Sequence, residues 1–310
     1  MRPLAPLAAV FLVFRPCAAF AWSVHGHEIV ALIAQDKLEK ESPRTLAAVQ
    51  NLLAVGLDPS QSAPSMAQVA PCADQIRLGY PVNCAGIHLQ GDKSTEDWHF
   101  INIPITDAQP AVDKYCKGAC VVAQVQGEFA TLRDPAASPQ AKQLALIYMI
   151  HFVGDMHQPL HCAYGIWPDK KTHQPGNDYG GNEEEGKFLG APLSLHSVWD
   201  HLIEPSDLLD PRQTAQALGS GGSGSADDVL SGQAALESFQ IARANIYPKF
   251  NGGHGSPFGD PGQDDAYQQQ EQQVAFDRLE LAGARLAALL ERALGPQPPA
   301  VMAARASKGR

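Results

Sequence analysis

Positively charged residues are scarce in this sequence. Its 310 residues include 23 lysines and arginines against 33 aspartates and glutamates, which gives a formal net charge of −10 at pH 7. This balance excludes a broadly basic surface of the kind that binds nucleic acid through many phosphates. If the protein acts on phosphates, localised cations must hold them.

Long apolar runs are also missing. The N-terminal run, residues 4–14, is too short to span a bilayer. It follows Arg2, and residues 19–21 read Ala-Phe-Ala, an A-x-A cleavage signal. We therefore expect residues 1–21 to be a signal peptide that is cut before Trp22. The protein should be exported to the periplasm or the medium, without a membrane anchor.

No two cysteines have the C-x-x-C spacing, which excludes a zinc knuckle built on cysteine pairs. In an oxidising compartment, Cys72 with Cys84 and Cys116 with Cys120 are close enough in sequence to form disulfides. Cys162 would then be the free thiol. Other pairings stay open, because connectivity does not follow from sequence alone.

Helical periodicity dominates the rest of the chain. The pair Ser138-Pro139 is an N-cap followed by proline at the first helical position, and it predicts a helix to about His157. The same signature at Ser42-Pro43 predicts a helix to Val55. Further helices are predicted over 24–40, 227–247 and 264–294.

Extended patterns are nearly absent, with one weak strand candidate at Trp98–Ile103. We expect an all-α fold of about eight helices that forms one domain over residues 22–294. The glycine-rich segments 219–225 and 251–262 are predicted to be mobile surface loops, and 295–310 a disordered tail.

Two segments place a histidine and an aspartate four residues apart, namely His151 with Asp155 and His196 with Asp200. Residues four apart lie on one helix face, so the imidazole and carboxylate of each pair point the same way. His161 follows just beyond the first helix. One such pair is usually a surface hydrogen bond, but two pairs in one chain indicate a catalytic zinc site.

His157 is predicted to stay out of that site. It lies roughly 200° round the helix from Asp155, so a place in the core or behind the ligands is expected.

Three further segments offer partners. Cleavage before Trp22 would give that residue a free amino group beside its own carbonyl, which together with His27 could chelate a metal. Asp74 and Arg77 lie one helical turn apart, and His99 stands in an apolar stretch. Each segment alone is a weak signal.

The combined pattern consists of Trp22 with His27, Ala73-Asp74-x-Ile-Arg77, Trp98-His99-Phe100-x-Asn102, His151-x-x-x-Asp155-x-His-Gln-Pro-Leu-His161, Gly180-Gly181-Asn182 and Leu195-His196-Ser-Val-Trp199-Asp200. In this order and spacing it resembles the S1/P1 nuclease family. These are zinc-dependent nucleases specific for single strands, with 3′-nucleotidase activity. The resemblance runs from Trp22 to about Leu290 and implies the all-α fold of the phospholipase C and P1 nuclease type. Ser23 departs from it, because the family usually has glycine there.

The resemblance implies a site with three zinc ions. Its ligands would be Asp74, His99, His151 and Asp155 for the first ion, the backbone of Trp22 with His27 and a bridging Asp155 for the second, and His161, His196 and Asp200 for the third. Arg77 would lie near the scissile phosphate and act with Asp74 and Asp155 in catalysis. Phe100 would stack on the base, and Asn102 would bond to its edge.

The implied activity is hydrolysis of single-stranded DNA and RNA to 5′-nucleotides, and of 3′-nucleotides, by a monomer. The zinc ions would lower the pKa of a water to supply the nucleophile, and Arg77 would stabilise charge on the phosphate. They would also make the site cationic on an acidic protein. A preference for single strands follows if Phe100 must stack on an unpaired base.

Two alternatives remain open. A zinc phospholipase C has similar ligands, but its first histidine lies farther from the N-terminal tryptophan and its third site ends in glutamate. The spacing of Trp22 and His27, and Asp200 at the third site, favour the nuclease. A non-enzymatic exported zinc-binding protein would take up metal without cleaving phosphodiesters.

Overall fold

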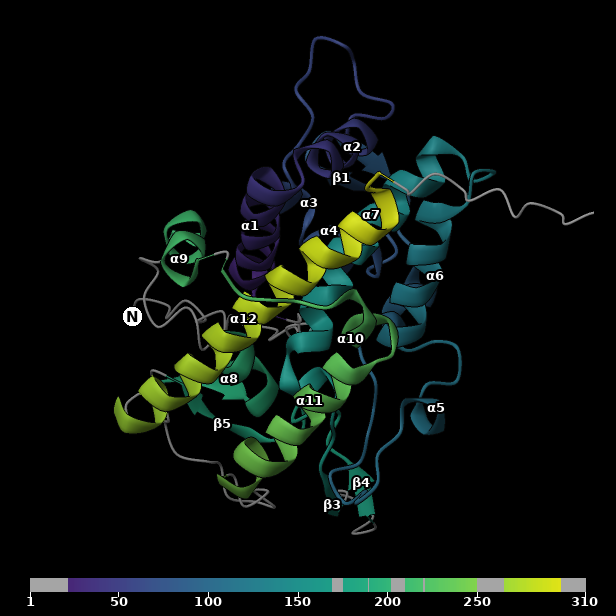
Figure 1. Cartoon of the computed structure of the whole chain (residues 1–310). Helices are drawn as coiled ribbons and strands as arrows, with labels where there is room; N and C mark the ends of the chain where they lie inside the picture. The colour runs from purple at the N-terminus through teal and green to yellow at the C-terminus, as the bar shows by residue number, and fades with distance from the viewer. Residues whose placement is uncertain are drawn as a thin grey trace, which may run out of the picture.

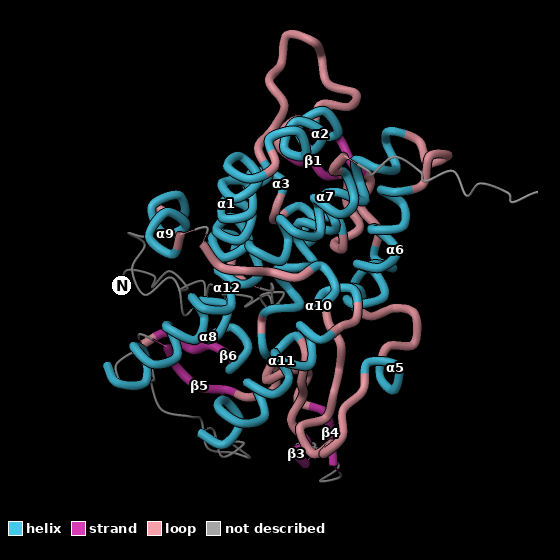
Figure 2. The backbone as a smooth tube through the Cα atoms, viewed as in Figure 1, coloured by secondary structure: helices cyan, strands magenta, loops and turns pink. Residues whose placement is uncertain are grey.

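The computed structural model describes residues 22–168, 175–188, 190–201, 210–219, 221–249 and 265–296. The expected signal peptide, the loop 251–262 and nearly all of the expected tail lie outside these residues. Over the described residues the chain is mostly helical, as the all-α prediction requires (Figures 1 and 2).

The α-helices are α1 (Val24–Glu41), α2 (Pro43–Leu53), α3 (Met66–Val69), α4 (Cys72–Ile76), α5 (Val112–Tyr115), α6 (Val121–Arg133), α7 (Pro139–His157), α8 (Leu195–His201), α9 (Pro211–Leu218), α10 (Ala226–Leu230), α11 (Gln233–Ile241) and α12 (Asp265–Leu294). The tighter and wider turns are the 3-10 helices η1 (Lys93–His99), η2 (Pro159–His161) and η4 (Tyr247–Lys249) and the π-helix η3 (Ala242–Ile246).

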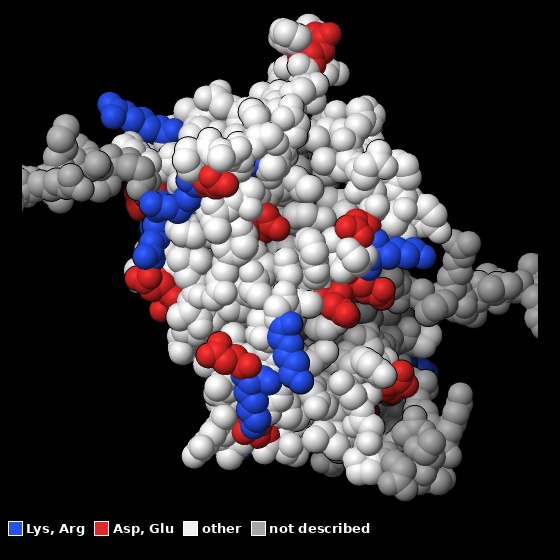
Figure 3. Space-filling view, turned by 90° about the vertical axis from the view of Figure 1, so that its right-hand side faces the viewer, with Lys and Arg blue, Asp and Glu red and all other residues white. Residues whose placement is uncertain are grey.

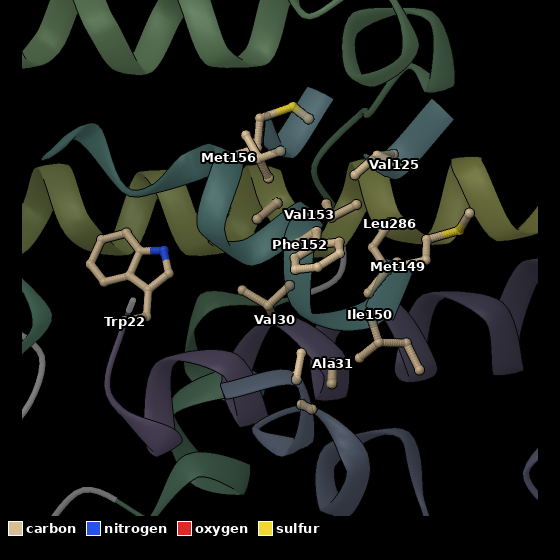
Figure 4. Packing of buried hydrophobic residues seen from close by; sticks show 14 of the residues in the cluster. Trp22, Val30, Ala31, Val125, Met149, Ile150, Phe152, Val153, Met156 and Leu286 are labelled. Carbon is tan, nitrogen blue, oxygen red and sulfur yellow. The ribbon is translucent and has the colours of Figure 1, made fainter. Parts of the chain in front are cut away.

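Helix α7 lies at the centre of the core. It begins as its sequence predicts, with the Ser138 hydroxyl accepting a hydrogen bond from the backbone N–H of Ala141 and proline at the next position. Every residue from Ala145 to His157 is buried, because neighbouring helices cover α7 on all sides. Figure 4 shows its side chains packed with those of other helices: Met149, Ile150, Phe152, Val153 and Met156 of α7, Val30 and Ala31 of α1, Val125 of α6 and Leu286 of α12.

Helices α1, α6 and α12 form most of the cover around α7. Helix α12 crosses α1 and α7 diagonally, and α6 runs along the other side of α7 (Figure 1). Both α1 and α12 match the predicted ranges to within one residue, and α7 ends at His157 as predicted.

The predicted helix over 227–247 is wrong as a single element. The chain breaks between α10 and α11 at Gly232, which has a φ of +78°. A Cβ atom there would lie 2.6 Å from a methyl carbon of Val112, so only glycine makes this turn without strain. After Ile241 the chain widens into η3 and then tightens into η4.

The strand candidate at Trp98–Ile103 is also wrong. Trp98 and His99 close the 3-10 helix η1, and the residues after them belong to no strand. They still run extended, because the backbone N–H of Ile101 donates to the carbonyl of His161 and that of Tyr164 donates to the carbonyl of Ile103.

Three short antiparallel hairpins were not predicted, since strands of three or four residues give too little alternation to detect. They pair β1 (Val82–Cys84) with β2 (Ile87–Leu89), β3 (Ile166–Pro168) with β4 (Pro175–Asn177), and β5 (Glu185–Phe188) with β6 (Ala191–Ser194). Figure 2 shows the last two pairs at the end of the molecule opposite α2.

The predicted disulfides are confirmed. Cys72 in α4 is bonded to Cys84 at the end of β1, and Cys116 to Cys120, while Cys162 is free and buried. Among the described residues, no helix has the length and apolarity needed to cross a bilayer. On the face drawn in Figure 3, acidic and basic side chains are interspersed among uncharged ones.

Candidate metal centre

Helix α7 contributes the first two candidate ligands. His151 and Asp155 lie one turn apart, with the His151 Nε2 atom 3.3 Å from the Asp155 Oδ2 atom, so the sequence correctly placed them on one face. Both side chains are fully buried. A buried carboxylate needs a compensating positive charge, from a proton or from a metal.

Two other elements complete this cluster. His99, at the end of η1, has its Nδ1 atom 2.9 Å from Asp155 Oδ2 and 3.1 Å from His151 Nε2. Asp74 of α4 has its Oδ1 atom 3.6 Å from the same His99 nitrogen. The structure therefore gathers the four predicted ligands of the first ion around one point.

His27 of α1 approaches the other oxygen of the same aspartate. Its Nε2 atom lies 3.4 Å from Asp155 Oδ1, and its ring stacks on His151 with centroids 3.9 Å apart. A Cβ atom on Gly154 would lie 2.8 Å from the His27 ring, so only glycine allows this approach. The two oxygens of Asp155 thus face two different groups of ligands.

Trp22 is held by the backbone beside Asp155 and at Asp200. Its indole nitrogen donates a hydrogen bond of 3.0 Å to the carbonyl oxygen of Gly154, and the side chain is completely buried. The N–H of the following residue, Ser23, donates to the carbonyl oxygen of Asp200. These bonds fix the backbone of Trp22 between α7 and α8.

A separate cluster joins His161 of η2 with His196 and Asp200 of α8. The two histidine Nε2 atoms lie 3.1 Å apart, and His196 Nε2 lies 3.8 Å from Asp200 Oδ2. All three side chains are buried. In this cluster and in the groups His27–His151–Asp155 and Asp74–His99–His151, one candidate ligand atom from each residue lies within 4.8 Å of the others.

The backbone orients three of the histidines. The Nδ1 atoms of His151, His161 and His196 lie 2.7 to 2.8 Å from carbonyl oxygens of Ala70, His99 and Gly180. A carbonyl only accepts, so each Nδ1 carries the proton and each Nε2 turns a lone pair towards its cluster. This is the usual arrangement behind metal-ligating histidines.

Several buried donor and acceptor atoms without a hydrogen-bond partner belong to the candidate ligands. They include both ring nitrogens of His27, Nε2 of His99 and Oδ1 of Asp74 and of Asp155. Buried polar atoms in proteins are nearly always satisfied. A divalent cation among these lone pairs would satisfy several of them, and imidazole with carboxylate suits zinc.

Burial and neighbouring charge set the protonation of these groups. Burial lowers the pKa of His196 to about 3 and, together with the adjacent His151, lowers that of His27 well below its usual value. Burial opposes ionisation of Asp155, but His151 and the hydrogen bond from His99 hold the pKa of Asp155 well below its usual range. His151 is the exception among the histidines, since Asp155 and Asp74 outweigh burial and raise its pKa.

Acidification is therefore expected to expel the metal. Histidine must be neutral to bind zinc, and His151 has to lose a proton that Asp155 stabilises. We expect zinc affinity to fall as the pH is lowered below about 7, because the raised pKa of His151 lies above the ordinary histidine value, and activity to be lost below about pH 5. Competition with a chromophoric chelator at several pH values measures the affinity. Constant affinity between pH 5 and pH 7 would contradict this protonation scheme.

Gln158, a residue of the recognised motif with no predicted role, supports the separate cluster. Its amide nitrogen donates a 2.7 Å hydrogen bond to Asp200 Oδ1, which leaves Oδ2 facing His196. Substitution Gln158→Met should weaken metal binding at this cluster by roughly 10- to 100-fold, the usual loss for a residue behind a ligand. Zinc titration measures this, with Gln143→Met as the control, because the buried Gln143 bonds to backbone carbonyls of Leu53 and Val55.

His157 lies outside the clusters, as predicted. Its Nδ1 atom donates to the carbonyl oxygen of Val153, and its Nε2 atom lies 3.1 Å from an Arg285 nitrogen. Burial and the charges of Arg278 and Arg285 hold the pKa of His157 well below its usual value, so the ring is neutral and accepts from Arg285.

A cleft of about 500 Å³ opens beside the separate cluster. The predicted substrate residues Arg77, Phe100 and Asn102 line it together with His161 and His196. Arg77 is anchored by an ion pair of 3.1 Å between its Nη2 atom and Asp74 Oδ1. The cleft therefore holds a cation and an aromatic ring close to candidate ligands.

Several residues that line the cleft were not predicted to take part: Leu78, Tyr80, Lys93, Glu96, Leu160, Tyr179 and Asn182. Asn182 belongs to the recognised Gly-Gly-Asn motif, which marked its place but gave no role. Leu160, in η2, belongs to the recognised motif that ends at His161, which likewise gave it no role. The others lie on loops and on η1, and no spacing pattern in the sequence points to them.

Comparisons with known proteins agree with this geometry. The family model described as S1/P1 Nuclease matches residues 22–295. Endonuclease 2 of Arabidopsis thaliana is 26% identical over 213 residues, covering 65% of this chain and 62% of that protein. Nuclease P1 of Penicillium citrinum is 29% identical over 184 residues, covering 58% and 57%. Nuclease S1 of Aspergillus oryzae is 28% identical over 204 residues, covering 64% and 60%. The alignments thus span about three fifths of each relative.

Proposed function

The chain belongs to the S1/P1 nuclease family, and from this we propose that it is a zinc-dependent nuclease that hydrolyses single-stranded DNA and RNA to 5′-nucleotides. We further propose that it removes the phosphate from 3′-nucleotides. The observation that carries the proposal is the set of three buried histidine and aspartate clusters beside a cleft lined by Arg77 and Phe100.

We assign the zinc ligands as the family pattern implies. Asp74, His99, His151 and Asp155 would hold one ion, the backbone of Trp22 with His27 and the second oxygen of Asp155 another, and His161, His196 and Asp200 a third. The opposite directions of the two Asp155 oxygens support its bridging role, since Oδ2 faces His99 and Oδ1 faces His27. The buried ligand atoms without a hydrogen-bond partner support the presence of a cation.

When bound, zinc ions lower the pKa of a water molecule and stabilise negative charge on phosphate oxygens. The protein's own groups act around them. The Arg77 guanidinium, fixed by Asp74, would donate to the phosphate oxygens as their charge grows. Phe100 would stack on a base and Asn102 would bond to its edge, which favours an unpaired base over one inside a duplex.

Export would place the protein where its disulfides persist. The leader-like residues 1–21 and the disulfides support secretion to the periplasm or the medium. We propose that the mature protein begins at Trp22, that residues 22–294 form its catalytic domain, and that it acts as a monomer.

The experiment that tests the activity is release of 5′-mononucleotides from poly(A) and from denatured DNA by the zinc-loaded mature protein. Native duplex DNA is the comparison, and phosphatidylcholine vesicles test the phospholipase alternative. Zinc binding without cleavage of either polymer would contradict the nuclease proposal and favour a zinc-binding protein. Cleavage of the lipid alone would favour a phospholipase C.

Removal of the metals is expected to lower the stability of the protein as well as abolish its hydrolytic activity. The proposed ligands come from α1, α4, η1, α7, η2 and α8, so the ions would act as cross-links between distant segments. Excess EDTA should abolish hydrolysis and lower the melting temperature, with both restored by added zinc. An unchanged melting curve after verified metal removal would show that the clusters contribute nothing to folding.

A further inference from the structure

We infer that the rim of the cleft carries a second nucleotide subsite, in which Tyr80 stacks on a base and Lys93 binds a phosphate. It would take a nucleotide beyond the one held by Phe100 and Asn102, so it governs how longer single strands bind. This inference rests on the proposed nuclease function and deepens it.

The first evidence for this subsite is a group of exposed apolar side chains at the rim of the cleft, formed by Leu78, Tyr80 and Tyr179. Tyr80 is 68% exposed, Tyr179 62% and Leu78 39%, and all three line the cleft. Large apolar side chains gathered at one exposed place in a soluble protein usually mark a binding surface. Folding does not explain Tyr80, because most of its side chain stays in water.

The backbone that carries Tyr80 is held in place. A Cβ atom on Gly91 would lie 2.2 Å from the carbonyl oxygen of Tyr80, so the two segments are in close contact. Tyr80 lies between Cys72 and Cys84 in the sequence, and the disulfide that joins these two cysteines closes the segment into a loop. An aromatic ring carried on a fixed backbone has only its own side-chain rotations to lose on binding, which suits a stacking platform.

Two positively charged side chains line the cleft together with Tyr80. The side-chain carbons of Lys93 cross Gly79, where a Cβ atom would lie 2.7 Å from Lys93 Cγ, and Lys93 lines the cleft together with Arg77. The two cations contrast with the acidic chain as a whole. Glu96 also lines the cleft, and its carboxylate can only accept, so it suits the amino group of a base rather than a phosphate.

Aromatic stacking with nearby cations is the chemistry of single-stranded nucleic acid. Stacking accepts every base, because each base has a flat face. An acyl chain would use Leu78 and Tyr80 but not the ammonium of Lys93. The observations therefore favour a polynucleotide at the rim over a lipid.

The first test compares KM for oligoadenylates from two to ten nucleotides long, with Tyr80→Ala and Tyr80→Phe variants. In the wild type, KM should fall as the oligomer grows long enough to reach Tyr80. Tyr80→Ala should raise KM for the decamer roughly 5- to 150-fold, by the usual effect of losing one stacked base, and leave the dimer nearly unchanged. Tyr80→Phe should behave as the wild type, since the ring remains.

The second test concerns Lys93. Replacing one phosphate contact to a single strand should reduce the slope of log KM against log salt concentration by about 0.7. Lys93→Gln should show this change for the decamer. Lys117→Gln is the matched control, because Lys117 is exposed but does not line the cleft.

The outcomes separate the subsite from the proposed function. A wild type that cleaves no oligomer overturns both. Wild-type cleavage with equal KM changes for dimer and decamer in Tyr80→Ala, or none for either, overturns the subsite alone. An unchanged salt slope in Lys93→Gln overturns the phosphate contact.

Discussion

A form of the protein that keeps one extra residue ahead of Trp22 is expected to hydrolyse poly(A) at least ~100-fold more slowly than the form that begins at Trp22 and to bind about one zinc ion fewer. This is the largest effect that we expect from a change outside the ligand side chains. The nitrogen of Trp22 would become an amide, whose lone pair is delocalised and ligates zinc poorly.

The structure leaves the N-terminus little freedom to compensate. The indole of Trp22 is buried and bonded to Gly154, and Ser23 is bonded to the backbone of Asp200. The extended form should therefore keep its helical content while it lacks the ion between Trp22, His27 and Asp155.

Both forms can be made from fusions that a protease cuts before Trp22 or one residue earlier, with the ends confirmed by mass spectrometry. The comparison is zinc stoichiometry and poly(A) hydrolysis. His25→Ala in the shorter form is the control, because His25 is only partly buried and belongs to none of the clusters. Equal zinc content and rate in both forms would refute the backbone ligand and make His25 the next residue to test.

The second large effect is a contrast between two histidines near the end of α7. His161→Ala should lose the metal shared with His196 and Asp200 and reduce hydrolysis by more than the ~10- to 100-fold typical of residues behind a ligand. His157→Ala should keep its zinc and most of its activity.

His157→Ala should instead reduce stability. It removes the acceptor for Arg285 in a buried network, and a lost buried hydrogen-bond partner costs about 1–3 kcal/mol. Zinc content, turnover and urea denaturation of both variants measure the contrast. Equal losses of activity at the two positions would mean that the two residues do not differ in role.

The sequence predicted the main helices well because their ends carry local signals. Ser138-Pro139 and Pro159 mark the ends of α7, and the cap requires only neighbouring residues. The break at Gly232 was missed, because a single glycine in a helical pattern does not show that its backbone turns left-handed or that Val112, far away in sequence, packs against it. Local periodicity contains no information about such a contact.

The same limit applies to the candidate site. Histidine and aspartate four residues apart fix each other's direction within one helix, so His151 with Asp155 and His196 with Asp200 could be found by spacing. Tyr80 reaches the cleft from a loop closed by a disulfide, and Lys93 reaches it from the start of η1, with its side chain in close contact with Gly79. Which loop residues face the cleft is decided by the three-dimensional packing, which the sequence pattern does not reveal.

Helix α7 has a consequence for how this protein can evolve. It supplies both the middle of the core and two of the proposed ligands, and all its residues from Ala145 onward are buried. A substitution that repacks Phe152 or Val153 would also move His151 and Asp155, since they share one rigid helix. A substitution in this segment would therefore affect activity and folding together, so selection on either property would act against it. Adaptation to a new substrate should accumulate instead in the loops of the cleft rim, where residues can change without disturbing the helix.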